Sequence, residues 1–342
     1  MKEVAVVGAG GMGTCIAYAL SELGYFVHLV DIASIHDHEK MDKLSVNYLF
    51  HNSLDSLNEL SVVISAAPYT ENQKIATYCL ERGIPYCDLG GDPDTTVAIH
   101  EKCRLHKGKV FTDLGLAPGL INIITEYEYQ LNKQVKDITM AVGGLPVNPQ
   151  GRLKYGVTWS TKGLRNEYQG SFDIIKDGKI TPVSALGGYE TFDFPEVSKV
   201  EAFYTKGALS TSLNLMYERG VKNFRYKTMR YIGHCNLIQF LLEDCAMDDE
   251  VFEKCIKEAC PITKQDIVLL MVRMDNDNKF YCVKHDENWT AMQRATAFPA
   301  ATIASMMAEN TFEDKEVLTY ADVPFSDLQT KLNMIGEFPN LF

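Results

Sequence analysis

A glycine-rich turn near the start of the chain has the spacing that binds the diphosphate of a dinucleotide. Gly8, Gly10 and Gly13 form a G-x-G-x-x-G pattern between an apolar strand-like run and a helix-like run. The first glycine permits a tight turn, the second leaves room for the pyrophosphate, and the third lets helix and strand approach closely. N–H groups at the start of the helix would face the phosphates. We therefore expect Gly8, Gly10, Gly11, Met12 and Gly13 to contact a cofactor.

An acidic residue stands at the end of the next apolar run. Asp31 follows Gly13 by about the 20 residues typical of this motif. A carboxylate there accepts hydrogen bonds from the ribose hydroxyls and repels a 2′-phosphate. Ile32 and the residues after it offer no arginine that would bind such a phosphate. The sequence thus favours NAD over NADP, with Asp31 and Ile32 at the adenosine end.

Two further segments are expected at the cofactor. Ser65, Ala66, Ala67 and Pro68 follow an apolar run, and small residues at the carboxyl edge of a strand suit a loop beside the nicotinamide ribose. Asn122, one turn into a later helix, is expected to face the cofactor amide.

Composition restricts the partners. The formal net charge is -12, which repels phosphate backbones and argues against nucleic acid. No apolar stretch reaches the roughly 20 residues that cross a bilayer, and the first residues do not resemble a signal peptide, so a cytoplasmic protein is expected. The nine cysteines include no CxxC pair. They are interpreted as reduced buried thiols, and no metal site is predicted.

Alternating strands and helices must position the cofactor residues. This alternation predicts βαβ units, and hence a doubly wound parallel sheet of the Rossmann type. The expected strands cover residues 3–7, 26–30, 47–50, 62–66, 86–89 and 110–114. The expected helices cover residues 12–23, 71–82, 95–106 and 120–131.

The pattern changes after residue 118. Segments of period two between 137 and 204, including one at 153–160, predict a mixed or antiparallel sheet, and Asp177-Gly178 predicts a hairpin turn. Further helices are expected at 237–242, 248–259 and 295–309, and strands at 265–273 and 279–284. We expect an α/β chain with two domains. Residues 1–117 and about 295–342 would bind NAD, and 118–294 would form an α+β domain for substrate binding and oligomerisation.

Several motifs, spread over almost the whole chain, resemble the saccharopine dehydrogenase-like family, and within it the lysine 6-dehydrogenases. Beyond Gly8–Gly13 these motifs are Asp88–Gly90, Asp113–Gly119, Gly143–Pro146, Tyr155–Ser160, Gly163–Tyr168, Glu201–Phe203, Arg230–His234 and Arg294–Asn310. Saccharopine reductases usually carry an acidic residue where this chain has Ala117, which favours a substrate other than saccharopine.

The resemblance implies NAD-dependent oxidative deamination of the terminal amine of L-lysine, or of a similar amino acid, to the semialdehyde. A lysine ammonium has a pKa of about 10.4, and hydride leaves readily only when the nitrogen is neutral, so a base is needed. Asp88 and His234 are the catalytic candidates. Asp88 is equally suited to a turn before Gly90, and a lone histidine is more often structural.

Substrate binding is assigned by the same resemblance. Arg230 is expected to grip the substrate carboxylate, with Asp113 as a weaker candidate near the amine. Trp159 is either core or a wall for the aliphatic chain. Thr211 is a candidate for the substrate head group. A homodimer or higher homo-oligomer is also implied.

Two other functions remain open. Saccharopine or carboxynorspermidine dehydrogenase/reductase chemistry would need several basic side chains in one pocket, for which Arg152, Arg165, Arg225 and Arg230 are candidates. A non-catalytic NAD-binding sensor would bind cofactor without turnover.

Overall fold

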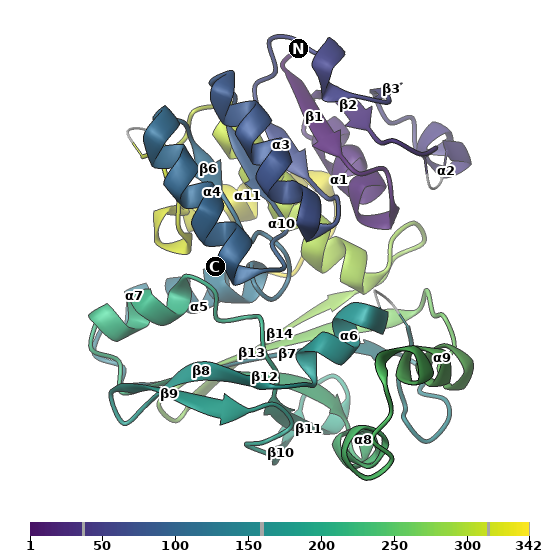
Figure 1. The fold of residues 1–342 in the computed structure, drawn as a ribbon, viewed down its shortest axis with the longest axis vertical. Helices are drawn as coiled ribbons and strands as arrows, with labels where there is room; N and C mark the ends of the chain where they lie inside the picture. The colour runs from purple at the N-terminus through teal and green to yellow at the C-terminus, as the bar shows by residue number, and fades with distance from the viewer. Residues whose placement is uncertain (36–37, 158–160, 313–314, 342) are drawn as a thin grey trace. The chain divides into compact units, whose positions relative to one another are not determined.

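The computed structural model describes residues 1–35, 38–157, 161–312 and 315–341, which form two compact units (Figure 1). The first unit joins both ends of the chain, Met1–Ile123 and Gln293–Phe342, and the second comprises Ile124–Met292. No helix within the described ranges has the length and apolar character needed to cross a membrane.

A parallel sheet forms the centre of the first unit. Its order, within the described residues, is β3-β2-β1-β4-β5-β6, and each neighbouring pair is parallel. This confirms the predicted Rossmann sheet. The order reverses between β1 and β4, which places a ligand site beyond their carboxyl ends. The strands are β1 (Glu3–Val7), β2 (Phe26–Val30), β3 (Tyr48–His51), β4 (Val63–Ser65), β5 (Tyr86–Asp88) and β6 (Val110–Phe111).

Helices cover both faces of this sheet. Figure 1 shows α3 and α4 in front of the sheet and α10 and α11 behind it. A core of apolar side chains, among them Val63, Ile75, Leu80, Tyr86 and Ile99, holds α3 and α4 against the strands. The helices of this unit are α1 (Gly11–Glu22), α2 (His38–Lys43), α3 (Tyr69–Glu81), α4 (Pro93–His106), α10 (Ala291–Ala308) and α11 (Phe325–Ile335), with short 3-10 turns η1 (Leu54–Ser56) and η3 (Tyr320–Asp322). Helix α5 (Leu120–Leu131) begins in the first unit and continues into the second.

The second unit contains the predicted mixed sheet. Its main order is β10-β11-β12-β7-β13-β14, and β8 and β9 form a hairpin beside β12. Among the described strands of this second sheet, only β7 and β12 pair in parallel. The hairpin turns at Asp177-Gly178, as predicted, because both residues have positive φ. The strands are β7 (Asp137–Pro146), β8 (Ser171–Lys176), β9 (Lys179–Ser184), β10 (Glu190–Phe194), β11 (Ser198–Tyr204), β12 (Asn223–Tyr231), β13 (Asp266–Met274) and β14 (Asp277–Lys284).

Short helices pack at one side of this sheet around a shared apolar core. The core includes Leu164, Tyr168, Phe203, Ile238 and Phe252. These helices are α6 (Thr161–Glu167), α8 (His234–Gln239), the π-helical turn η2 (Phe240–Asp244) and α9 (Asp249–Ala259). Another helix, α7 (Ser212–Glu218), contributes no residue to this core and contacts β8.

The strand predicted at 153–160 is wrong for its described part. Residues 153–157 make a single isolated bridge, from Val157 to Ile262. Lys154 has a φ of 49°, which turns the backbone out of an extended path. The remaining residues, 158–160, lie outside the described part of the chain.

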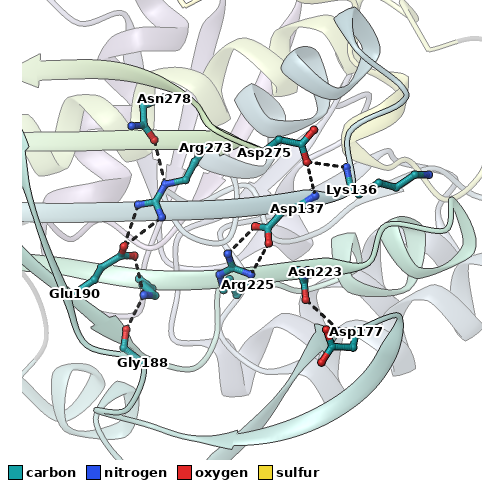
Figure 2. Close-up of polar contacts among 11 residues, drawn as sticks. Lys136, Asp137, Asp177, Gly188, Glu190, Asn223, Arg225, Arg273, Asp275 and Asn278 are labelled. Atoms are coloured by element: carbon teal, nitrogen blue, oxygen red, sulfur yellow. Dashed lines mark hydrogen bonds and ion pairs between the residues drawn. The ribbon is translucent and has the colours of Figure 1, made fainter.

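A network of paired charges links several strands of the second unit, as Figure 2 shows. Arg225 on β12 makes two hydrogen bonds to Asp137, of 2.6 and 3.3 Å. Arg273 on β13 contacts Glu190 at 3.1 Å, and Lys227 on β12 donates to the same carboxylate at 2.7 Å. These charges satisfy one another, so the network is read as structural.

Candidate functional site

The glycine-rich loop closes tightly on the end of β1. A Cβ added to Gly13 would lie 1.6 Å from the carbonyl oxygen of Gly8, and one added to Gly8 would lie 2.8 Å from backbone atoms of Ala66. A Cβ added to Gly10 would meet nothing within 4 Å. Two glycines are therefore required by the protein's own packing, whereas Gly10 borders open space that a ligand can occupy.

No described side chain of the protein occupies the N–H groups at the start of α1. Its N-cap residue is Gly10, no side chain caps it, and no acidic residue stands in the first turn. The unsatisfied N–H groups and positive end of the helix therefore remain available to an anion. This arrangement fits a diphosphate, and Gly11, Met12 and Gly13 would lie along it.

Asp31 is held next to the glycine-rich loop. Its Oδ2 accepts a hydrogen bond of 2.6 Å from the N–H of Ala9, and its Oδ1 accepts one of 2.8 Å from Ala33. The neighbouring Ile32 is 95% exposed. The carboxylate is thus fixed at the carboxyl end of β2, and an apolar side chain stands free beside it.

The segment Ser65–Pro68 lies directly against the same loop. The N–H of Ala66 donates to Val7 at 2.7 Å, and backbone atoms of Ala66 and Ala67 bound the space over Gly8. The Ser65 hydroxyl donates to Asn72 at 2.8 Å, which ties the loop to α3. The structure therefore brings two of the predicted cofactor segments together.

Gln293 is a neighbour of this loop that sequence reasoning missed. Its side-chain amide donates to the carbonyl of Gly11 at 2.9 Å. The two residues are 282 positions apart, and no local pattern marks a glutamine in α10 as a partner of the first helix.

Asp88 and Asp113 form a buried acidic pair at the ends of β5 and β6. Asp88 Oδ1 accepts hydrogen bonds from the N–H groups of Gly90 and Asp113, at 2.8 and 3.1 Å, and Oδ2 accepts one from the Tyr86 hydroxyl at 3.0 Å. Burial, and next the charge of Asp113, raise the pKa of Asp88 to about 7. Asp88 thus organises its loop and is also poised to exchange a proton near neutral pH.

The loop after Asp113 is compact. Asp113 has a φ of 63°, and Thr96 donates to its carboxylate at 3.3 Å. A Cβ on Gly119 would lie 1.8 Å from the carbonyl oxygen of Gly115. Asn122 accepts a hydrogen bond from the N–H of Gly119 at 2.9 Å. Its side-chain oxygen therefore supports the start of α5.

In the second unit, Arg230 and His234 share a partner that the sequence did not reveal. Arg230 Nε donates to the Tyr168 hydroxyl at 3.0 Å, and the same hydroxyl lies 3.1 Å from His234 Nε2. His234 Nδ1 contacts the carbonyl of Leu153 at 2.9 Å. Because a carbonyl only accepts, Nδ1 carries the proton, Nε2 accepts, and Tyr168 donates to it.

This chain of hydrogen bonds holds His234 in its neutral form. Burial, and next the charge of Arg230, lower the pKa of His234 to about 3. Both ring nitrogens are engaged, so the imidazole has no nitrogen to offer a substrate in this conformation. Arg230 as a residue is 4% exposed, and its guanidinium carbon stands over the rings of Tyr155 and Tyr168, at 5.2 and 5.9 Å from their centroids.

Within the described part of the second unit, no other predicted substrate residue contacts Arg230. Thr211 is the half-buried N-cap of α7 and makes no side-chain cap. Trp159 lies outside the described residues. Arg152 is exposed, Arg165 pairs with Asp249 at 2.5 Å, and Arg225 pairs with Asp137. Within the described residues, the four arginines therefore do not gather in one cluster.

Glu167 is a second group that sequence reasoning left unassigned. It ends α6, directly before Tyr168, and burial raises its pKa to about 7 against the opposing charge of Arg230. The segment Gly163–Tyr168 was noted in the sequence as part of the family resemblance, but no function was assigned to its glutamate.

Comparison with known proteins agrees with this geometry. Residues 4–137 match the model of the saccharopine dehydrogenase NADP binding domain, and residues 115–333 match that of the saccharopine dehydrogenase C-terminal domain. Apo histidine-tagged saccharopine dehydrogenase (L-Glu forming) from Saccharomyces cerevisiae has the same fold, with a TM-score of 0.74, 14% identity and 97% of both chains covered.

A shorter likeness is found to UDP-N-acetylmuramate–L-alanine ligase of Lawsonia intracellularis. The identity is 33% over 86 residues, which cover 25% of this chain and 19% of the ligase. The matched stretch is too small a part of either protein to indicate a shared activity.

Proposed function

The chain belongs to the saccharopine dehydrogenase family, and we propose that it is an NAD-dependent dehydrogenase that deaminates the terminal amine of L-lysine. The buried Arg230 carries this proposal. A guanidinium is always charged, and a buried charge requires a counter-charge. Its Nε and Nη1 are used by Tyr168 and the Met229 carbonyl. Nη2 makes no hydrogen bond with a described residue, which leaves it for a substrate carboxylate.

The first unit has an oxidoreductase fold and a loop that fits a nicotinamide dinucleotide. Open space over Gly10 and the uncapped start of α1 suit its diphosphate. When bound, the nicotinamide accepts a hydride from the carbon that bears the amine. Ser65–Pro68 and Asn122 would hold that end of the cofactor, and Asp31 the adenosine end.

Asp31 supports NAD as the preferred form. Both carboxylate oxygens accept backbone N–H groups, and Ile32 rather than a basic residue stands beside it. The matching model bears NADP in its description. In this chain a 2′-phosphate would meet the negative charge of Asp31 without a compensating arginine.

Asp88 is the proposed proton acceptor. The substrate ammonium must lose one proton before hydride leaves, and a carboxyl with a pKa of about 7 can take it near neutral pH. The neutral amine loses hydride to give an iminium, which water converts to the aldehyde and ammonium. Asp113, whose charge raises the Asp88 pKa, would assist by disfavouring the ionised form of its neighbour.

The dispersed arginines argue for lysine rather than saccharopine. Saccharopine carries three carboxylates, and a matching pocket would collect several cations. Arg225 and Arg165 are paired with other acids, and Arg230 is hydrogen-bonded to the hydroxyl of Tyr168. A single guanidinium is sufficient to bind the single carboxylate of lysine.

The test is turnover by the purified protein at mildly alkaline pH, followed by the absorbance of the reduced cofactor. L-lysine, saccharopine and L-ornithine are each supplied with NAD+ or NADP+. The proposal expects lysine with NAD+ to give the highest kcat/KM. Turnover of saccharopine instead would move the function to that reaction, and cofactor binding without turnover of any amine would contradict both.

A further inference from the structure

Tyr86 is a buried tyrosine whose hydroxyl has no role in the reaction as described so far. It lies two residues before Asp88 on β5, so the two side chains point to the same face of the sheet. Its ring is fully buried in the apolar core that joins the sheet to α3 and α4, which also contains Val63 and Ile99. Packing around the ring therefore fixes the direction in which the hydroxyl points.

The hydroxyl of Tyr86 donates a hydrogen bond of 3.0 Å to Oδ2 of Asp88, its one hydrogen-bond partner among the described residues. Two titratable thiols lie near it, those of Cys79 on α3 and Cys87 on β5. Burial raises the pKa of Cys79 to about 12 and that of Cys87 well above its usual value. Both thiols thus stay neutral, and the carboxylate is the stronger acceptor for the hydroxyl.

The two oxygens of Asp88 are occupied unequally. Oδ1 accepts two backbone hydrogen bonds, from the N–H of Gly90 at 2.8 Å and from that of Asp113 at 3.1 Å. Each carboxylate oxygen offers about two acceptor positions, so Oδ1 is full and Oδ2 keeps one position beside the Tyr86 hydroxyl. A proton taken up by Asp88 therefore binds at Oδ2.

The geometry points to Tyr86 as a positioning residue, whose hydroxyl orients Oδ2 of Asp88 and sets how readily that oxygen accepts the proton of the substrate ammonium. The inference rests on the proposed function, in which Asp88 is the proton acceptor. A hydrogen bond donated to a carboxylate stabilises its ionised form. Asp113 acts in the opposite direction, because its charge favours the protonated form of Asp88. Tyr86 thus keeps part of Asp88 ionised and able to accept a proton at neutral pH.

The test is the pKa of Asp88, measured in the full chain without substrate. Aspartate is labelled with ¹³C at the carboxyl carbon, and the Asp88 signal is the one that Asp88→Asn lacks. This signal is followed against pH by NMR in the unaltered chain, in Tyr86→Phe and in Tyr25→Phe. The last variant is a matched control, because it also removes a buried hydroxyl that is hydrogen-bonded to a carboxylate, here that of Glu309.

Tyr86→Phe keeps the ring and should raise the proton affinity of Asp88 about tenfold, which moves its pKa from about 7 to about 8. Tyr25→Phe should leave that pKa unchanged. An unchanged pKa in Tyr86→Phe overturns the inference, even if the variant melts at a lower temperature, because the hydroxyl would then only stabilise the fold. An equal rise of the pKa in Tyr25→Phe overturns it as well.

A second substitution applies if Tyr86→Phe does not fold. A ring-fluorinated tyrosine at position 86 keeps the hydroxyl and makes it a stronger donor, because fluorine renders a phenol more acidic. The pKa of Asp88 should then fall below that of the unaltered chain. A pKa that stays the same or rises contradicts the inference.

The pH dependence of lysine oxidation separates this inference from the proposed reaction. In Tyr86→Phe the acidic limb of the kcat/KM profile should move upward by about one pH unit, whereas a purely structural defect would lower the rate at every pH. If the Asp88 pKa rises in Tyr86→Phe while the unaltered chain does not oxidise lysine, the proposed reaction fails and the effect of Tyr86 on Asp88 stands. If lysine is oxidised and neither the pKa nor the profile moves, the reaction stands and the role of Tyr86 is wrong.

Discussion

The hydroxyl of Tyr168 donates to Nε2 of His234 across 3.1 Å and so closes the last free position on that imidazole. The histidine was a candidate base on sequence grounds, yet its other nitrogen already donates to Leu153. His234 therefore holds the Tyr168 hydroxyl in place, and Tyr168 in turn positions the Arg230 guanidinium.

His234 should make the protein sensitive to acid. Its pKa is lowered in the folded state, so the unfolded state binds the proton more readily, and stability is lost as pH falls from about 6.5 toward 3. Urea unfolding at pH 5 and pH 7 measures the loss. The difference between the two pH values should shrink in His234→Gln. An unchanged difference would mean that another group causes the acid sensitivity.

Gly10 and Gly13 should behave oppositely when replaced by alanine. Gly13→Ala places a methyl group 1.6 Å from a backbone oxygen, so its melting temperature should fall sharply. Gly10→Ala meets no protein atom within 4 Å, so its stability should be retained while NAD+ affinity falls by about tenfold or more. Thermal unfolding and cofactor titration check both. Undiminished NAD+ affinity in Gly10→Ala would contradict the placement of the diphosphate.

Asp31 should determine which cofactor is used. Replacing it with serine removes a charged acceptor for the ribose hydroxyls, which should weaken NAD+ binding by about ten- to a hundredfold. NADP+ binding should weaken less or improve, because the repulsion of the 2′-phosphate is gone. The measurement is the ratio of kcat/KM values for the two cofactors. A ratio unchanged from that of the parent chain would exclude Asp31 from the adenosine end.

Asp88 should make stability fall as pH rises. Its folded pKa of about 7 lies above its ordinary value of 3.8, so the folded state holds the proton more tightly. The stabilisation is full below about pH 4 and is lost as pH rises through 7, by at most about 4 kcal/mol. Asp88→Asn should flatten this slope and also suppress turnover. Full activity in a folded Asp88→Asn variant would remove it from catalysis and leave only its role in the loop.

The sequence was informative where a local pattern determines the structure. The alternation of apolar strand-like and helix-like runs predicted the Rossmann sheet, and the glycine spacing located the tight turn between β1 and α1, because both depend on neighbouring residues. The positive φ at Asp177 and Gly178 was likewise predictable from their residue types.

Contacts between distant residues were not predictable in this way. Gln293 reaches Gly11 from 282 positions away, and Tyr168 joins Arg230 and His234 from a separate helix-end segment. The alternation around residues 153–157 resembled a strand, but the left-handed backbone at Lys154 and packing under α6 and α9 replaced it with a turn. The raised pKa of Glu167 results from its surroundings in the folded chain, which a sequence pattern does not reveal.

The most direct test of the proposed reaction is the fate of hydrogen at C6 of lysine. The protein is incubated with NAD+ and L-lysine deuterated at C6, and the reduced cofactor is analysed by mass spectrometry. The proposal predicts reduced cofactor that carries one deuterium, with the aldehyde formed at C6. Reduced cofactor without deuterium, obtained with turnover of the labelled lysine, would show that hydride leaves another carbon and would contradict terminal deamination.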